Sequence, residues 1–105
     1  MSKLIPQTLL NNIPDLYGTE GSLNPTCYVK IFTPDSNWTW YIIEISKTDS
    51  TCYGYVKGVD SELGYFDLLE IELLRGPLGL AVELDSSFVP IPFATVKKNE
   101  DDSSS

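Results

Sequence analysis

The chain contains no histidine and only two cysteines among its 105 residues. Histidine is the commonest general base and metal ligand, and zinc sites and acyl-transfer triads depend on histidine or on clustered cysteines. The two cysteines, Cys27 and Cys52, form no C-x-x-C motif. We therefore expect a protein that is not an enzyme and that binds neither a metal nor another cofactor.

Long apolar segments are also missing. The longest runs are a few residues long, whereas a membrane-spanning helix needs about 20. The segment Met1–Pro6 carries a single basic residue, and Pro6 interrupts its apolar stretch, which is unlike a secretory signal. These features predict a cytoplasmic protein with no membrane contact.

Basic residues are scarce. The chain has 15 acidic and seven basic residues, which gives a formal net charge of −8. Residues 1–98 alone carry 12 acids and seven bases, a net charge of −5. Phosphate backbones repel a protein of this sign unless its cations gather on one face, so nucleic acid is disfavoured as a partner. The charge favours a protein partner, and a basic, nucleic-acid-binding protein would suit it best.

The length and composition predict one globular domain. A chain of 105 residues with 42% hydrophobic residues can bury one core but not two independent ones. We place this domain at residues 1–98. Residues 99–105, which contain three consecutive acids followed by three serines, are predicted to form a disordered tail.

Three segments rich in β-branched and aromatic residues predict an antiparallel meander over residues 26–58. They are Thr26–Thr33, Trp38–Ser46 and Thr51–Gly58, and short polar loops separate them. In the first loop, Pro34 presets the backbone dihedral of a type I turn. The fold class is therefore α+β: a single small domain on an antiparallel sheet with one or two short helices.

The flanking segments predict those helices and further strands. Residues 6–13 predict a short helix that Pro14 ends, and residues 62–66 predict a short strand. Residues 68–74 favour a helix capped by Asp67 and ended near Arg75 and Gly76, although alternating leucines and acids leave a strand as the alternative. Residues 80–96 predict extended chain.

Alternation along the meander predicts two different faces. The first, a core face, would hold Cys27, Val29, Ile31, Tyr41, Ile43, Ile45, Cys52 and Val56. The second, an aromatic face, would hold Tyr28, Lys30, Phe32, Trp38, Trp40, Ile42, Glu44, Tyr53, Tyr55 and Lys57. On the aromatic face, Lys30, Glu44 and Lys57 could form a cross-strand charge ladder. This face is either a second core covered by a terminal segment, which we favour, or an exposed binding platform with Trp38 and Trp40 partly accessible.

The two cysteines are predicted to be reduced and buried. Cys27 and Cys52 would begin the first and third strands of the meander, with the middle strand between them. That arrangement places them roughly 9–10 Å apart, which is beyond the reach of a disulfide.

Five sequence blocks resemble a known family. The blocks are Leu16–Glu20, Val29–Pro34, Trp38–Tyr41, Glu62–Phe66 and Arg75–Leu80. In this order they resemble a bacterial family of small domains of unknown function carried on plasmids and integrative conjugative elements. The resemblance implies a mobile-element context and supplies no activity or site residues.

Charge and context together predict a small acidic protein-interaction domain. It would bind a nucleic-acid-handling host-defence protein and inhibit it. The predicted contact residues are Trp38, Trp40, Asp35, Asp60 and Glu62, because exposed aromatics dominate interfaces and loops at one sheet end can converge. The alternative is a single-stranded nucleic-acid-binding module that stacks bases on Trp38, Trp40, Tyr53 and Tyr55.

Overall fold

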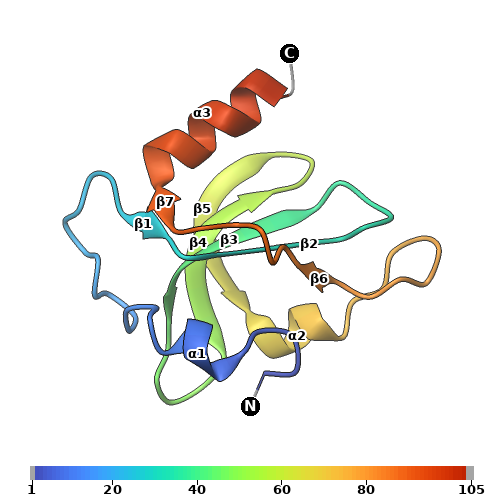
Figure 1. The fold of residues 1–105 in the computed structure, drawn as a ribbon, viewed down its shortest axis with the longest axis horizontal. Coiled ribbons are helices and arrows are strands. Elements are labelled where there is room, and N and C mark those ends of the chain that lie inside the picture. The colour runs from blue at the N-terminus through green and yellow to red at the C-terminus, as the bar shows by residue number, and fades with distance from the viewer. Residues whose placement is uncertain (1, 104–105) are drawn as a thin grey trace.

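The computed structural model describes residues 2–103 and shows a main antiparallel sheet flanked by helices (Figure 1). The helices are α1 (Gln7–Leu10), α2 (Leu68–Glu72) and α3 (Phe93–Ser103). The strands are β1 (Thr26–Cys27), β2 (Val29–Phe32), β3 (Thr39–Ile45), β4 (Thr51–Lys57), β5 (Ser61–Asp67), β6 (Glu83–Leu84) and β7 (Ile91–Pro92). No helix within the described residues is long and apolar enough to cross a membrane.

The main sheet has five strands in the order β5-β4-β3-β2-β6, and every neighbouring pair is antiparallel. β2, β3 and β4 form the predicted meander, and β5 extends it by a further hairpin. β1 pairs separately with β7 in a two-stranded sheet. The α+β class and the antiparallel meander are therefore confirmed. The first strand of the meander begins at Val29 and not at Thr26, because Thr26 and Cys27 pair with β7.

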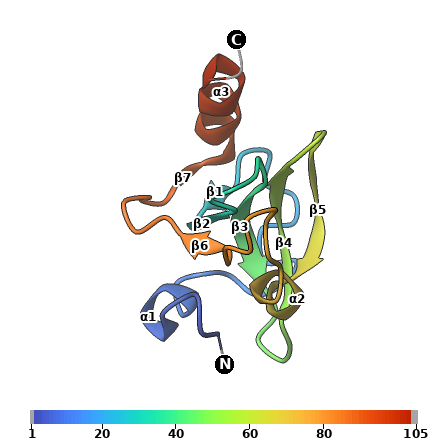
Figure 2. The same cartoon turned by 90° about the vertical axis from the view of Figure 1, so that its right-hand side faces the viewer.

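Each face of the main sheet is covered. α1 and α2 lie on one side and α3 on the other (Figure 2). The first core contains Ile5, Leu10, Ile13, Val29, Ile31, Trp40, Ile42, Ile45, Cys52, Leu68, Ile71 and Val82. The second core contains Cys27, Tyr41, Ile43, Tyr55 and Val96, with Phe88, Ile91 and Phe93 packed against it. The C-terminal segment therefore covers much of the aromatic face as a second core, which is the alternative that the sequence favoured.

The predicted face of β3 is wrong. Val29 pairs with Ile42, and Ile31 pairs with Trp40, so Trp40 and Ile42 belong to the first core. Tyr41 and Ile43 instead point into the second core. The cause is the register of the first hairpin, because a shift of one residue between paired strands exchanges their faces.

Residues 68–72 form a helix, as favoured from the sequence. The Asp67 carboxylate accepts a hydrogen bond from the Leu69 amide at 2.9 Å and caps the helix start. α2 ends earlier than predicted, at Glu72, and Gly76 is not its cap. The Arg75 guanidinium still reaches the helix end, where it donates to the carbonyl oxygen of Glu72 at 3.2 Å. β5 lies where the sequence predicted it. α1 also forms in the predicted segment, but it ends at Leu10 and not next to Pro14.

The C-terminal segment departs from the extended chain predicted for residues 80–96. α3 begins at Phe93, whose amide donates to the Pro25 carbonyl at 2.7 Å. The Ala94 amide donates to Asn24 Oδ1 at 2.8 Å. These partners lie about 70 residues earlier in the chain, so no local sequence pattern predicts where the helix starts. α3 also continues through residues 99–103 of the predicted disordered tail, while residues 104 and 105 lie outside the described part.

Both cysteines are reduced and fully buried, as predicted. They lie in different cores, Cys52 in the first and Cys27 in the second. Burial raises the pKa of each thiol to about 12, and the negative charge of Asp67 contributes at Cys52. These thiols are therefore protonated at neutral pH and behave as small apolar core residues.

Candidate functional site

The residues predicted for binding lie at one end of the sheet. The β2–β3 loop carries Asp35 and leads into Trp38, and the β4–β5 turn carries Asp60. Both loops extend to the same side of the molecule, together with the segment between α2 and β6 (Figure 1). The antiparallel register explains this convergence, because Thr39 pairs with Lys57 and Lys57 pairs with Ser61.

Trp38 and Trp40 have different environments. Their rings lie 6.1 Å apart with an interplanar angle of 21°, but Trp38 is 41% exposed and Trp40 only 5%. Trp38 also covers Gly58, where an added Cβ would lie 2.3 Å from the indole ring. The expected partial exposure is therefore right for Trp38 and wrong for Trp40.

Asp35 connects the β2–β3 loop to the turn of residues 76–80 through hydrogen bonds. One carboxylate oxygen, Oδ2, accepts hydrogen bonds from the Leu78 amide at 2.8 Å and from the Leu80 amide at 3.3 Å. The other oxygen packs against Gly76, where an added Cβ would lie 1.6 Å away. Asp35 thus fixes the 76–80 turn beside the β2–β3 loop.

Asp60 and Glu62 are exposed at the β4–β5 turn. Among the described residues, the ion pairs are those of Lys30 and Lys57, and neither includes these two acids. The Gly58 amide donates to the Asp60 carbonyl at 3.1 Å, which places the turn next to the Trp38 ring. Trp38, Asp60 and Glu62 are thus the members of the predicted set that stay accessible together.

A polar cleft of about 700 Å³ lies beside Trp38. Its walls come from β2, the β2–β3 loop, the start of β3, the end of β4, the segment after β6, and α3. Register places Lys30 opposite Tyr41 and Phe32 opposite Thr39, so these side chains share the α3 side of the sheet with Lys57. We call this hollow the lysine cleft.

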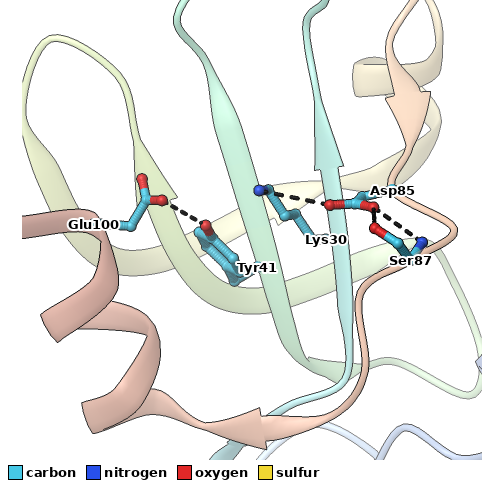
Figure 3. Close-up of polar contacts among 5 residues, drawn as sticks. All are labelled: Lys30, Tyr41, Asp85, Ser87 and Glu100. Carbon is cyan, nitrogen blue, oxygen red and sulfur yellow. Dashed lines mark hydrogen bonds and ion pairs between the residues drawn. The ribbon is translucent and has the colours of Figure 1, made fainter. Parts of the chain in front are cut away.

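Each lysine of the lysine cleft is paired with an acid from outside β2–β5. Figure 3 shows one of these pairs, Lys30 with Asp85. Lys30 Nζ lies 3.6 Å from Asp85 Oδ2 and 5.8 Å from the centre of the Tyr41 ring. Lys57 Nζ lies 2.9 Å from Glu100 Oε2. The predicted ladder of Lys30, Glu44 and Lys57 is therefore wrong.

Hydrogen bonds from outside the sheet shape the cleft further. The Tyr41 hydroxyl donates to Glu100 Oε1 at 2.9 Å, and burial and this contact raise the pKa of Tyr41. Ser87 donates to Asp85 from both its amide and its hydroxyl, and these bonds, assisted by Lys30, lower the pKa of Asp85. Sequence analysis missed Asp85 and Glu100, because no local pattern reveals which distant acid reaches a given lysine.

A second hollow, of about 360 Å³, lies on the other side of Trp38. It is lined by Trp38 and Trp40 together with Leu74, Arg75 and Pro77 of the segment after α2. Several exposed apolar side chains continue from it along α2 and this segment: Leu69, Leu73, Leu74, Leu78 and Leu80. We call this region the leucine surface.

Apolar, basic and acidic side chains surround Trp38. Among the described residues, no group of three or more histidine, cysteine, aspartate or glutamate side chains could hold a metal ion. The site offers instead one exposed indole between a polar hollow and an apolar one. The β4–β5 hairpin, whose Gly58 contacts this indole, carries two exposed acids, Asp60 and Glu62, that form no ion pair among the described residues.

The architecture defines a class of protein: a small α+β domain whose five-stranded antiparallel sheet is covered on both faces. The family model described as protein of unknown function (DUF2958) matches residues 3–96, and the chain therefore belongs to that family. No curated protein and no solved structure matches it.

Proposed function

We propose that this protein is a non-enzymatic interaction domain that binds a basic protein through the surface around Trp38. The observation that supports it best is the position of Trp38, 41% exposed between the lysine cleft and the hollow beside the leucine surface. A tryptophan at the centre of accessible apolar area is the side chain most often found to dominate binding energy. The neighbouring leucines supply the apolar area that surrounds such an anchor.

Charge supports a basic partner. The chain has a formal net charge of −8. Asp60 and Glu62 lie exposed on the β4–β5 hairpin, whose Gly58 contacts Trp38, and neither has an ion-pair partner among the described residues. Unpaired acids at the rim of an interface accelerate association with a positively charged protein and orient it. The acids would therefore guide the partner, and Trp38 would anchor it.

The nature of the partner follows from charge and from the family resemblance. An acidic surface competes with nucleic acid for the same basic groove of a nucleic-acid-handling protein. Small domains of this kind on plasmids and conjugative elements would gain from blocking such proteins in host defence. We therefore propose a defence enzyme or another nucleic-acid-handling protein of the host as the target, with inhibition as the result.

Direct binding of single-stranded nucleic acid is the weaker alternative. It needs an open stacking platform, but Trp40 is 5% exposed and Tyr55 4%. It also needs free cations, but Lys30 and Lys57 are paired with Asp85 and Glu100. Of the stacked pair Trp38 and Trp40, only Trp38 is exposed enough to stack on a base.

The test is an affinity experiment in two steps. Immobilised wild-type protein captures partners from a host lysate, and each captured protein is then purified and titrated calorimetrically. Trp38→Ala should weaken binding by about 30-fold, which corresponds to roughly 2 kcal/mol. The matched control is Val89→Ala, because Val89 is also exposed and apolar but lies between β6 and β7.

Two outcomes would contradict the proposal. One is a partner whose affinity is unchanged by Trp38→Ala. The other is submicromolar binding of single-stranded DNA or RNA in fluorescence anisotropy that Trp38→Ala abolishes, which would promote the nucleic-acid alternative.

A further inference from the structure

A second pocket lies far along the sheet from the lysine cleft, where the loop of residues 15–25 folds over the strands. It has a volume of about 450 Å³ and is lined by residues of this loop, of β3, β4 and β5, and of α3. Its main walls are the rings of Tyr17, Tyr53 and Tyr65, together with Leu63 and Phe93. We call it the tyrosine pocket.

Strand register builds one wall of the tyrosine pocket. Glu44 of β3 pairs with Tyr53 of β4, and Tyr53 pairs with Tyr65 of β5, so the three side chains form one row across the sheet. The rings of Tyr53 and Tyr65 lie 5.1 Å apart, and Tyr17 closes the row with its ring 6.4 Å from that of Tyr65.

A β-bulge directs Glu44 into this row. The register of β3 and β4 shifts between Ile42 and Glu44. Without the shift, Glu44 would pair with Cys52 and face the first core; with it, Ile45 takes that place. Bulges redirect side chains in this way next to functional sites.

Glu44 is a buried carboxylate at the base of the pocket. It is 3% exposed, and no ion pair reaches it among the residues that the structure describes. Its Oε1 accepts from the Tyr17 amide at 2.7 Å. Its Oε2 accepts from the Thr19 amide at 2.9 Å and from the Thr19 hydroxyl. The donors to the Glu44 carboxylate are thus neutral groups, and no basic side chain among the described residues forms an ion pair with it.

The loop above Glu44 adopts an unusual backbone to make these contacts. Tyr17 has a φ of 67°, in the left-handed region that residues other than glycine rarely adopt. This conformation aims the Tyr17 amide at Glu44 while its ring lies beside Tyr65. Strained backbone held by surrounding contacts is typical of ligand sites.

The electrostatics of the tyrosine pocket select a cation. Tyrosine rings carry negative charge density on their faces, and Glu44 adds a full negative charge. Glu20 also lines the pocket, and no lysine or arginine does so among the described residues. Partial desolvation, a hydrogen bond with Tyr17 and the charge of Glu44 raise the pKa of Tyr65, so its phenol stays neutral at pH 7.

The hydrogen bonds of Glu44 select the kind of cation. Because its oxygens already accept three donors, Glu44 attracts charge and has little capacity left for a strongly hydrogen-bonding ammonium. A quaternary ammonium group needs no acceptor and is bound by aromatic faces. We propose that the tyrosine pocket binds a trimethylammonium group, carried by a choline-type small molecule or by a trimethylated lysine of a protein.

The proposal is tested by titrating the full-length protein with choline and with its neutral isostere, 3,3-dimethylbutan-1-ol, while NMR follows the tyrosine ring signals. Choline should bind with a dissociation constant on the order of millimolar and about tenfold more tightly than the isostere. An N-acetyl-trimethyllysine amide, titrated beside the unmethylated lysine amide, distinguishes a protein source from a small molecule.

Variants localise the site. Tyr65→Leu should weaken choline binding about tenfold, whereas Tyr65→Phe, which keeps the ring, should retain it. Tyr65 is 56% exposed on an edge strand, so both variants should fold, and thermal melts verify this. Trp38→Ala should leave choline binding unchanged, which separates this site from the proposed protein interface. Equal affinity for choline and its isostere, or no saturable shift at tens of millimolar, would overturn the proposal.

Discussion

Trp38 and Trp40 stack at 6.1 Å, yet the sheet divides their roles between its surface and its core. Trp40 is 5% exposed and packs with Ile31 and Ile42 in the first core, whereas Trp38 is 41% exposed at the end of the strand. The same residue type therefore serves stability at one position and remains available for contact two residues earlier.

Alanine substitution should separate these roles. Trp40→Ala removes a buried indole and should lower the free energy of unfolding by about 3–5 kcal/mol. Trp38→Ala should cost about 1 kcal/mol or less, because the ring is partly solvated. Urea unfolding followed by circular dichroism measures both changes. Equal losses for the two variants would show that Trp38 belongs to the core and is not free for a partner.

The contact of α3 with the sheet depends on Glu100. Its carboxylate accepts from the Tyr41 hydroxyl at 2.9 Å and pairs with Lys57 at 2.9 Å, and both partners belong to the central strands. Glu100→Ala should destabilise the protein by about 1 kcal/mol and speed amide hydrogen exchange in α3. Lys97→Ala, an exposed change on the same helix, is the control. Unchanged exchange in α3 after Glu100→Ala would mean that the other contacts of α3 hold the helix without Glu100.

Local chemistry was sufficient to predict the parts of the fold that local residues determine. The turn around Pro34 and the Asp67 cap are visible in the sequence because each depends on residues within a few positions. The helix start at Phe93 is not, because its amides bond to Asn24 and Pro25. The face of β3 was likewise missed, since the pairing register and not the alternation decides it.

The candidate sites also divide into one that local sequence predicts and one that depends on contacts between distant residues. Exposed Trp38 and Asp60 were predicted from composition and loop position. The tyrosine pocket was not, because it assembles Tyr17 and Tyr65 around Glu44 through a bulge that alternation cannot show. A buried acid in a β-strand, as at Glu44, was the available signal for such a site.

Gly54 and Gly64 offer a matched pair, because they face each other across β4 and β5. A Cβ at Gly54 would lie 1.9 Å from the Tyr41 carbonyl oxygen, whereas a Cβ at Gly64 meets nothing within 4 Å. Gly54→Ala must push β3 and β4 apart and should cost about 3 kcal/mol or more, while Gly64→Ala should change stability by less than about 1 kcal/mol. Thermal melts of both variants measure the difference. Similar melting temperatures would show that β3 and β4 can accommodate a methyl group at Gly54 without separating.

The buried thiols should make the protein lose stability in alkali. Burial raises the pKa of Cys27 and Cys52 from 9.0 to about 12, so above pH 9 the unfolded chain releases two protons that the folded protein keeps. Unfolding is then favoured as the pH rises from about 9 towards 12, and the thiol contribution is fully present below pH 9. Between pH 7 and pH 10 the free energy of unfolding should fall by about 1.4 kcal/mol for each thiol.

Urea titrations at pH 7, 8, 9 and 10 measure this loss, and a Cys27→Ala, Cys52→Ala double variant is the control. The variant should start from lower stability, because two small cavities replace the thiols, but its stability should change less with pH. Thiol labelling supplies an independent measure: at pH 8 the native protein should react slowly, and two thiols should react at once in denaturant. Rapid labelling of the native protein, or equal pH dependence of the two proteins, would contradict the assignment of both cysteines to sealed cores.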